Sequence, residues 1–202
     1  MMKHKLLLTF GVTLVVAWVL GMFLIFYFWP HLMYNTFEKA IVAKGFGSGP
    51  IPVNTLYTEP QALFAEPLAA QSASSSNLMT TGTNRDTLLT VGWLDLSKGP
   101  QVLHVPDMPD RYYNVQLTDP SDGADFANVG TRATGSHAGD YLITGPGWKG
   151  GVPQGMTLIS SPNRSVLVIG RVFVASDGDL ATAFGLTKQI QLTPLSHWQP
   201  GS

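Results

Sequence analysis

The chain has 202 residues, a formal net charge of −1 and only 12% charged residues, so it offers no basic surface for a nucleic-acid backbone. It has no cysteine, which excludes disulfides, thiolate metal sites and cysteine nucleophiles. Its 21 glycines and 14 prolines suit one turn-rich β domain that follows an apolar N-terminal segment.

The apolar segment runs from Leu6 to Trp29 without a charge and would span about 36 Å as a helix, enough to cross a bilayer. A cleavable signal peptide would have a shorter apolar region ending in small residues, whereas this one ends in bulky aromatic residues. We therefore expect an uncleaved anchor in the lipid bilayer. Because Lys3 and Lys5 precede the segment, the positive-inside rule predicts a cytoplasmic N-terminus and places the chain from about His31 outside.

Three parts follow from this expectation. Residues 1–30 are the cytoplasmic start and transmembrane anchor, residues 31–53 a juxtamembrane helix and linker, and residues 54–202 a periplasmic β domain on a bacterial inner membrane. The stretch PHLMYNTFEKAIVAKG has apolar residues near helical spacing, so we expect the helix to restart there as a juxtamembrane stalk. The stretch TEPQALFAEPLAAQ predicts a short helix after Pro60.

Strands dominate the sequence from Asn84 onward. In RYYNVQLTD the residues Tyr113, Val115 and Leu117 share one face, which we expect to point into the core. The run VLVIGRVFV is apolar on both faces and predicts a central strand, and a helix is predicted from about Gly178 to Gln189. The fold class is therefore mainly β, an antiparallel jelly-roll-like sandwich with a few short helices. The six predicted strands are DTLLTVGWLDL, PQVLHVP, RYYNVQLTD, DYLITG, GMTLISS and RSVLVIGRVFVAS.

Four motifs in fixed order resemble the bacterial domain-of-unknown-function family 1254, over about residues 50 to 195. They are NRDTLLTVGWLDLSKGPQVLHVPDMPDRYYNVQLTD, FANVGTRATGSHAGDYLITGPGWKG, SPNRSVLVIGRV and LTPL. The resemblance implies a β-rich, jelly-roll-like domain that is often followed by a second β domain in the same chain. It also implies that this short, membrane-anchored form pairs with a separate anchored protein that carries the companion domain. Leu89 stands where the family commonly has tyrosine, and the family supplies no established reaction.

Carboxylates are the candidates for a hydrolytic, carbohydrate-active site, which needs two of them about 5 to 9.5 Å apart. Most aspartates here adjoin Gly, Pro, Ser or Asn, where an aspartate usually organises a turn. Asp119 and Asp140, with His137, are the candidate catalytic residues. The motif G-x-S-x-G of a serine nucleophile is absent, and the histidines are too isolated to predict a metal site. We expect no metal and no cofactor.

Arginine and aromatic side chains form the second candidate set, because a guanidinium fork suits carboxylate or phosphate and an aromatic ring offers a stacking face. The candidate ligand-binding residues are Arg111, Tyr112, Arg132, Trp148 and Arg171. The competing interpretation is that the arginines pair with aspartates to satisfy the ends of the sandwich.

A subunit or scaffold of a membrane-envelope protein complex is the function that these patterns favour over an enzyme. A hydrolase using aspartates in a sandwich cleft and a non-catalytic binder of glycan or lipid remain the alternatives. The stretch ITGPGWKG predicts a tight turn at Gly145 to Gly147 that directs Trp148 toward the sandwich edge or a partner.

Overall fold

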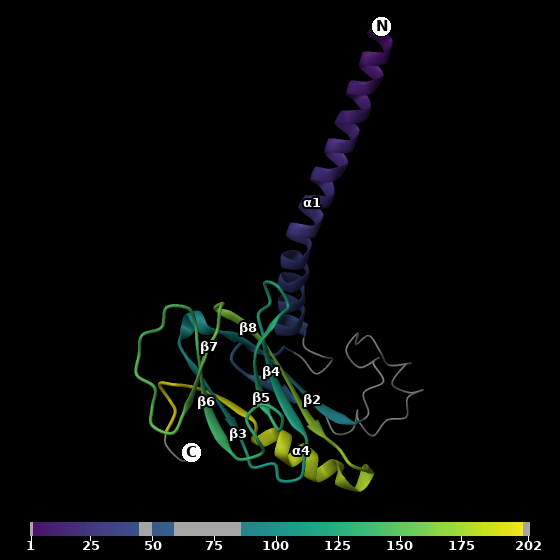
Figure 1. Ribbon diagram of the computed structural model, residues 1–202. Coiled ribbons are helices and arrows are strands. Elements are labelled where there is room, and N and C mark those ends of the chain that lie inside the picture. Colours follow the sequence, from purple (N-terminus) through teal and green to yellow (C-terminus); the bar gives the residue numbers. More distant parts are fainter. Residues whose placement is uncertain (1, 45–49, 59–85, 200–202) are drawn as a thin grey trace.

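The computed structural model describes residues 2–44, 50–58 and 86–199 and shows a two-layer β sandwich at one end of a long helix (Figure 1). This confirms a mainly β fold with a few helices. The helix predicted after Pro60 lies outside the described residues.

Helix α1, Met2–Lys44, is one continuous helix of 43 residues. In the described part of the chain it is the one helix long and apolar enough to cross a membrane. Its large apolar side chains between Phe10 and Trp29 are exposed, and Figure 1 shows this part of the helix standing clear of the sandwich. The helix continues through Pro30 instead of restarting after it. A proline removes one helical hydrogen bond, but the later turns are fixed by the packing of Phe37 and Ile41 on the sandwich.

Nine strands in the described residues form two sheets. The five-stranded sheet has the order β1-β2-β8-β4-β5, and the four-stranded sheet has the order β7-β6-β3-β9. The purely antiparallel arrangement expected from the sequence is wrong at one pair, because β6 and β7 are parallel and residues 145–156 carry the chain from one end of the sandwich to the other. The strands are β1 (Leu56–Thr58), β2 (Thr87–Asp95), β3 (Gln101–Val105), β4 (Tyr113–Thr118), β5 (Asp125–Gly130), β6 (Gly139–Thr144), β7 (Thr157–Ser160), β8 (Ser165–Phe173) and β9 (Gln191–Pro194).

The core between the sheets confirms the alternation predicted for β4, since Tyr113, Val115 and Leu117 are all fully buried there. Strand β8 is covered on both faces, as its sequence predicts. Val168 packs into the core between the sheets, whereas Leu167 packs on the outer side of the five-stranded sheet. All six predicted strands are present; five lie within their predicted runs, and β6 begins one residue earlier.

A second apolar cluster on the outer face of the five-stranded sheet holds the last turns of α1. Ile41 and Trp93 are 2% and 1% exposed, and the Phe37 ring meets the Trp93 ring edge-on with the centroids 6.5 Å apart. The Trp93 indole Nε1 donates a hydrogen bond to the Ser165 hydroxyl at 2.7 Å. The stalk is therefore part of the domain's packing. We call this the docking cluster, formed by Phe37, Ile41, Val42, Ile51, Val91, Trp93 and Leu167.

The sandwich has two ends, which we name by the helices found there. At the α1 end, strands β2, β4, β6 and β9 finish and β3 and β8 begin; the opposite end carries α4 (Figure 1). Helix α4, Leu180–Gln189, confirms the helix predicted from Gly178 to Gln189. It follows a short 3-10 turn η2, Asp177–Asp179, and buries Leu180, Ala183 and Thr187; a second 3-10 turn, η1, spans Leu96–Lys98.

Three strands were not predicted from the sequence: β1, β5 and β9. Each lies at the edge of its sheet and has six residues or fewer. Strands β1 and β9, with three and four residues, are too short to show a clear alternation, and β5, DFANVG, does not alternate regularly between apolar and polar residues.

Candidate functional site

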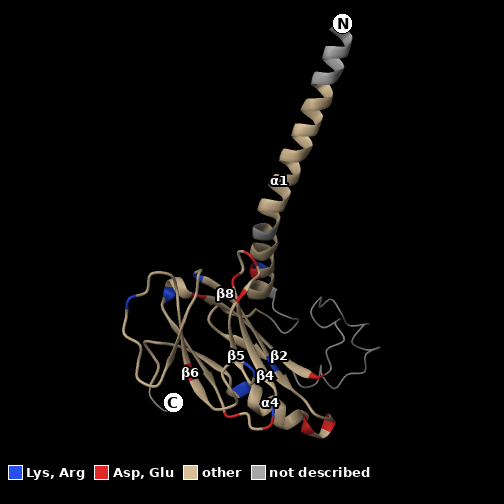
Figure 2. Ribbon diagram, in the orientation of Figure 1, with Lys and Arg blue, Asp and Glu red and all other residues tan. Residues whose placement is uncertain are grey.

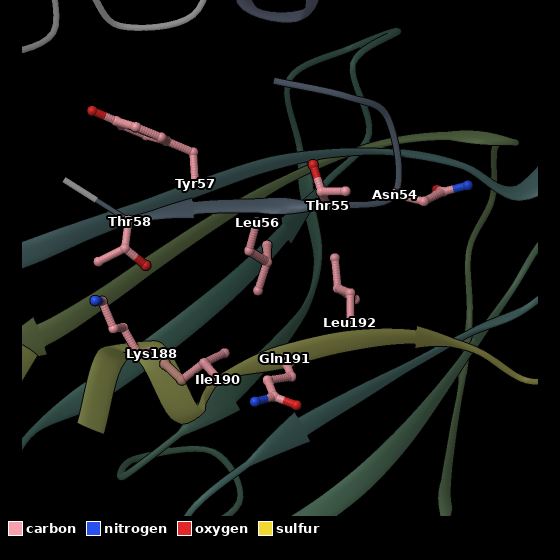
Figure 3. A pocket seen from close by; sticks show the side chains of 9 residues that line it. All are labelled: Asn54, Thr55, Leu56, Tyr57, Thr58, Lys188, Ile190, Gln191 and Leu192. Carbon is pink, nitrogen blue, oxygen red and sulfur yellow. The ribbon is translucent and has the colours of Figure 1, made fainter. Parts of the chain in front are cut away.

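A groove of about 450 Å³ lies between the edge strands β1 and β9, beside the C-terminal turn of α4. Figure 3 shows Leu56 of β1 and Leu192 of β9 pointing toward one another across it, while Thr58 points toward Lys188 of α4. We call it the β1–β9 groove. It is lined by Asn54, Thr55, Leu56, Tyr57, Thr58, Lys188, Ile190, Gln191 and Leu192.

Strand β1 is held in place by two backbone features next to the groove. Gly92 permits the close approach, because a Cβ at this position would lie 2.6 Å from the Thr55 carbonyl oxygen. Asn54 has a positive φ of 64°, a conformation that asparagine tolerates better than most residues. Its backbone N–H donates to the Trp93 carbonyl at 2.7 Å, and its side-chain oxygen accepts from the Asp95 N–H at 2.8 Å. These bonds fix the groove wall to strand β2.

The described lining of the groove is mostly uncharged. Lys188 is the one charged residue among the described residues that line it, so they offer no acid and base pair. Leu56, Ile190 and Leu192 provide an apolar floor, and the outer edges of β1 and β9 pair with no other strand in the described residues. An apolar floor between open strand edges can accept an extended chain or the edge of another β domain.

The two candidate catalytic aspartates lie at opposite ends of the sandwich. Asp119 follows β4 at the α1 end, where its buried carboxylate accepts from the Ser121 N–H at 2.8 Å and from the Asn163 amide at 3.3 Å. Asp140 lies at the start of β6, at the α4 end, and its Oδ1 is 2.7 Å from Nδ1 of His104 across the β3–β6 pair. The structure does not bring them together as a catalytic pair.

His137 is fully exposed on the loop before β6, with its Nδ1 3.7 Å from the Asp107 carboxylate. Asp107 also accepts a hydrogen bond from the Ala138 N–H at 2.7 Å, which organises this loop. No group of three His, Asp or Glu side chains that could hold a metal ion occurs in the described parts of the chain.

Arg111 is engaged by an aspartate that the sequence patterns did not single out. Its guanidinium makes two hydrogen bonds of 2.6 Å to the Asp179 carboxylate and one to the Phe173 carbonyl oxygen at 2.5 Å. These hydrogen bonds lower the pKa of Asp179 to about 2, and they raise the pKa of Arg111. The pair ties the segment before α4 to the end of β8. The signal that could have pointed to Asp179 is its position just before α4, which is typical of an N-cap, although its side chain makes no capping bond.

The rest of the arginine and aromatic set is dispersed. Arg132 lies over the Tyr112 ring, with its Cζ 5.5 Å from the ring centroid, at the α4 end. Arg171 is on β8, between Leu89 of β2 and Asn114 of β4 in the register of the five-stranded sheet. Trp148 lies at the α1 end. Arg132 with Tyr112 is the one cation–π pair within this set among the described residues.

The turn before Trp148 has the form that its sequence predicts. Gly147 has a φ of 78°, which glycine adopts readily, and the Trp148 N–H donates to the Gly145 carbonyl at 3.3 Å. The indole ring packs close to Gly150, where a Cβ would collide with it. Trp148 lines a second cavity of about 330 Å³, together with Ser97 and Arg164.

Comparison with known structures shows the same type of fold in a longer chain. The VPA0106 protein of Vibrio parahaemolyticus is 22% identical, with a TM-score of 0.61 over 84% of this chain and 37% of that chain. A protein of Burkholderia cenocepacia is 14% identical, with a TM-score of 0.43 over 72% of this chain and 36% of that one. The chain thus spans well under half the length of either structure.

The comparison with curated proteins finds no match. The family model described as "Protein of unknown function (DUF1254)" matches residues 67–194, which is more than half of the sequence. The chain therefore belongs to the DUF1254 family.

Proposed function

We propose that this chain is a single-pass inner-membrane protein whose jelly-roll-like periplasmic domain binds a companion β domain of a second membrane-anchored protein. It acts as a subunit or scaffold of an envelope complex. The observation that carries the proposal is the continuity of α1 from an exposed apolar stretch into the docking cluster.

This continuity has a mechanical consequence. The exposed stretch from Phe10 to Trp29 has the length and composition for a bilayer, where lipid covers its side chains. The same helix buries Ile41 against the outer face of the five-stranded sheet. A domain attached in this way is held at a set height above the membrane, as a scaffold requires and a freely diffusing enzyme does not.

We assign the companion domain to the β1–β9 groove. Its open strand edges and apolar floor offer backbone hydrogen bonds and burial to an incoming strand. In the longer VPA0106 chain, the part similar to this protein is joined to further chain, so a unit of this fold exists beside additional structure there. The hydrolase alternative has less support, because Asp119 and Asp140 lie at opposite ends of the sandwich.

Site-specific photo-crosslinking in native membranes tests the assignment. A photoreactive amino acid is placed at Leu192 in the groove, and at Asn128, which is exposed on β5 at the other edge of the five-stranded sheet, as the matched control. We expect one discrete protein adduct from Leu192 and none from Asn128. Equal adducts from both positions, or none from Leu192, would contradict the groove as the binding surface.

Protease accessibility tests the topology separately. Protease added to spheroplasts is expected to digest the β domain, whereas protease added to intact cells leaves it whole. A domain that resists digestion until the inner membrane is lysed would place it in the cytoplasm, against the proposal.

A further inference from the structure

The loops at the α1 end of the sandwich are the parts of the domain nearest the apolar stretch of α1. Tyr34 of α1 places its hydroxyl beside Gly123 in the β4–β5 turn. Loop 161–164 is tied to η1 at the same end, because the Leu96 N–H donates to the Arg164 carbonyl at 2.7 Å. The loops that share this end are residues 96–100, 119–124, 145–150 and 161–164.

The height of these loops follows from helix geometry. Trp29 ends the apolar stretch, and Tyr34 lies five residues later, about 7.5 Å along the helix axis at 1.5 Å per residue. The headgroup layer on each side of a bilayer is about 5 to 8 Å thick. If α1 spans a membrane, as the proposed function requires, the α1 end of the sandwich reaches the headgroup layer.

Positive side chains gather on one half of this end. Figure 2 shows Lys and Arg on loops away from α1 and acidic residues beside the base of the helix. Lys149 and Arg164 are exposed, and neither makes an ion pair with another described residue. Lys98 is 3.6 Å from the Asp95 carboxylate, and its side chain is 61% exposed. This ion pair is exposed to solvent and the Ser97 hydroxyl also donates to the same carboxylate, so Lys98 stays available to an anion in the solvent or at a membrane surface.

A concave site lies within this basic half. The cavity of about 330 Å³ is formed between η1 and the Gly145 turn, and the residues that line it include Ser97, Trp148 and Arg164. A guanidinium binds phosphate oxygens through paired donors, and tryptophan favours the membrane interface, where its ring is apolar and its N–H is polar. A serine, an arginine and a tryptophan thus line one cavity at the end of the sandwich that carries α1.

We propose that this cavity binds the phosphate headgroup of an anionic phospholipid and so tilts the domain toward the bilayer on its basic side. The inference rests on the membrane anchoring in the proposed function and is independent of the β1–β9 groove. Glu38 is on α1, and Asp122 and Asp125 flank Gly123, which lies beside Tyr34 of α1. We therefore expect the attraction to be local to the basic half. Each cation near an anionic surface strengthens association about fivefold, and salt weakens the effect.

The absence of cysteine allows a single-label experiment on the full chain. An environment-sensitive fluorophore is attached to Gly151→Cys, where a Cβ meets nothing within 4 Å and φ is not left-handed. Ala181→Cys, exposed on α4, is the matched control at the far end, and Val16→Cys reports insertion of α1. The protein is reconstituted in phosphatidylcholine vesicles with or without equimolar phosphatidylglycerol, both doped with headgroup-nitroxide lipid or with acyl-chain-nitroxide lipid.

We expect headgroup nitroxides to quench the Gly151→Cys label more strongly when phosphatidylglycerol is present, with no change at Ala181→Cys. Adding Lys149→Gln and Arg164→Gln should weaken docking about 25-fold and abolish the difference, while acyl-chain nitroxides still quench Val16→Cys. The lipid site would be overturned if the Gly151→Cys label were quenched equally in both lipids, or if the phosphatidylglycerol-dependent quenching persisted in the double variant. Reversal of that quenching by millimolar inorganic phosphate would overturn it as well. Loss of quenching at Val16→Cys would instead refute the membrane span and, with it, the proposed function.

Discussion

Truncating Ile41 to alanine should weaken the attachment of α1 to the sandwich by an amount that can be calculated from the buried side chain. Ile41 is 2% exposed in the docking cluster, and Ile41→Ala removes three buried carbons at about 0.8 kcal/mol each. A residual cavity adds to this loss, so the docking free energy should fall by about 3 kcal/mol. A change of this size corresponds to more than about a hundredfold rise in the undocked population.

Thiol labelling of Val91→Cys in the full-length protein in lipid nanodiscs measures that population. Val91 is 1% exposed in the docking cluster, so its thiol should react only when α1 lifts from the sheet. Lys39→Ala on the same helix is the control, because Lys39 is exposed. We expect Ile41→Ala to accelerate labelling at least about thirtyfold over Lys39→Ala, allowing for partial relaxation of the cavity.

The refuting result is equally specific. If labelling in the two variants agrees within about threefold, the scale of an ordinary surface substitution, then α1 does not shield the sheet and the scaffold argument fails. The Val91→Cys thiol can become exposed either when α1 undocks or when the whole sandwich unfolds. A denaturant titration run in parallel separates these two routes, since a variant that favours global unfolding lowers the unfolding midpoint of the sandwich.

Three further predictions concern the sandwich itself. The pKa of Asp179 is about 2 in the folded protein and 3.8 ordinarily. Its ionised carboxylate therefore stabilises the folded state above about pH 4, and this contribution is lost as the pH falls toward 2. We expect the urea midpoints of Asp179→Asn and the wild type to differ at pH 6 and to converge near pH 2. Gly92→Ala should displace β1, because it forces a Cβ against the Thr55 carbonyl. We expect faster amide hydrogen exchange in β1, while β2 and β8 stay protected. Unchanged exchange in β1 would contradict the close approach of β1 to Gly92. Trp93→Phe should lower the free energy of unfolding by about 1 to 2 kcal/mol through loss of the hydrogen bond to Ser165, measured from urea curves, and a neutral effect would show that this bond contributes nothing.

Local patterns were sufficient for much of the architecture. The apolar segment, six of the nine strands, the inward face of Tyr113 and the doubly covered β8 all follow from side-chain patterns that a few neighbouring residues reveal. The turn at Gly147 follows equally from local backbone sterics, because glycine after proline suits its positive φ. Family membership also followed from contiguous motifs.

The candidate sites depended on contacts between distant segments. Arg111 meets Asp179, 68 residues later, and Asp140 meets His104 across two strands, so neither partner could be read from its neighbours. The β1–β9 groove is formed by short edge strands whose sequences carry little signal of their own.

The sequence by itself determined that the chain has an apolar helix and a β domain, because both depend on side-chain periodicity within one segment. Only the tertiary structure decided that Phe37 and Ile41 join the domain's packing, that the two candidate aspartates lie at opposite ends, and that β1 and β9 border a groove. The physical reason is that strand order, register and the direction of each connection are set by packing across the whole sandwich, which no single segment encodes.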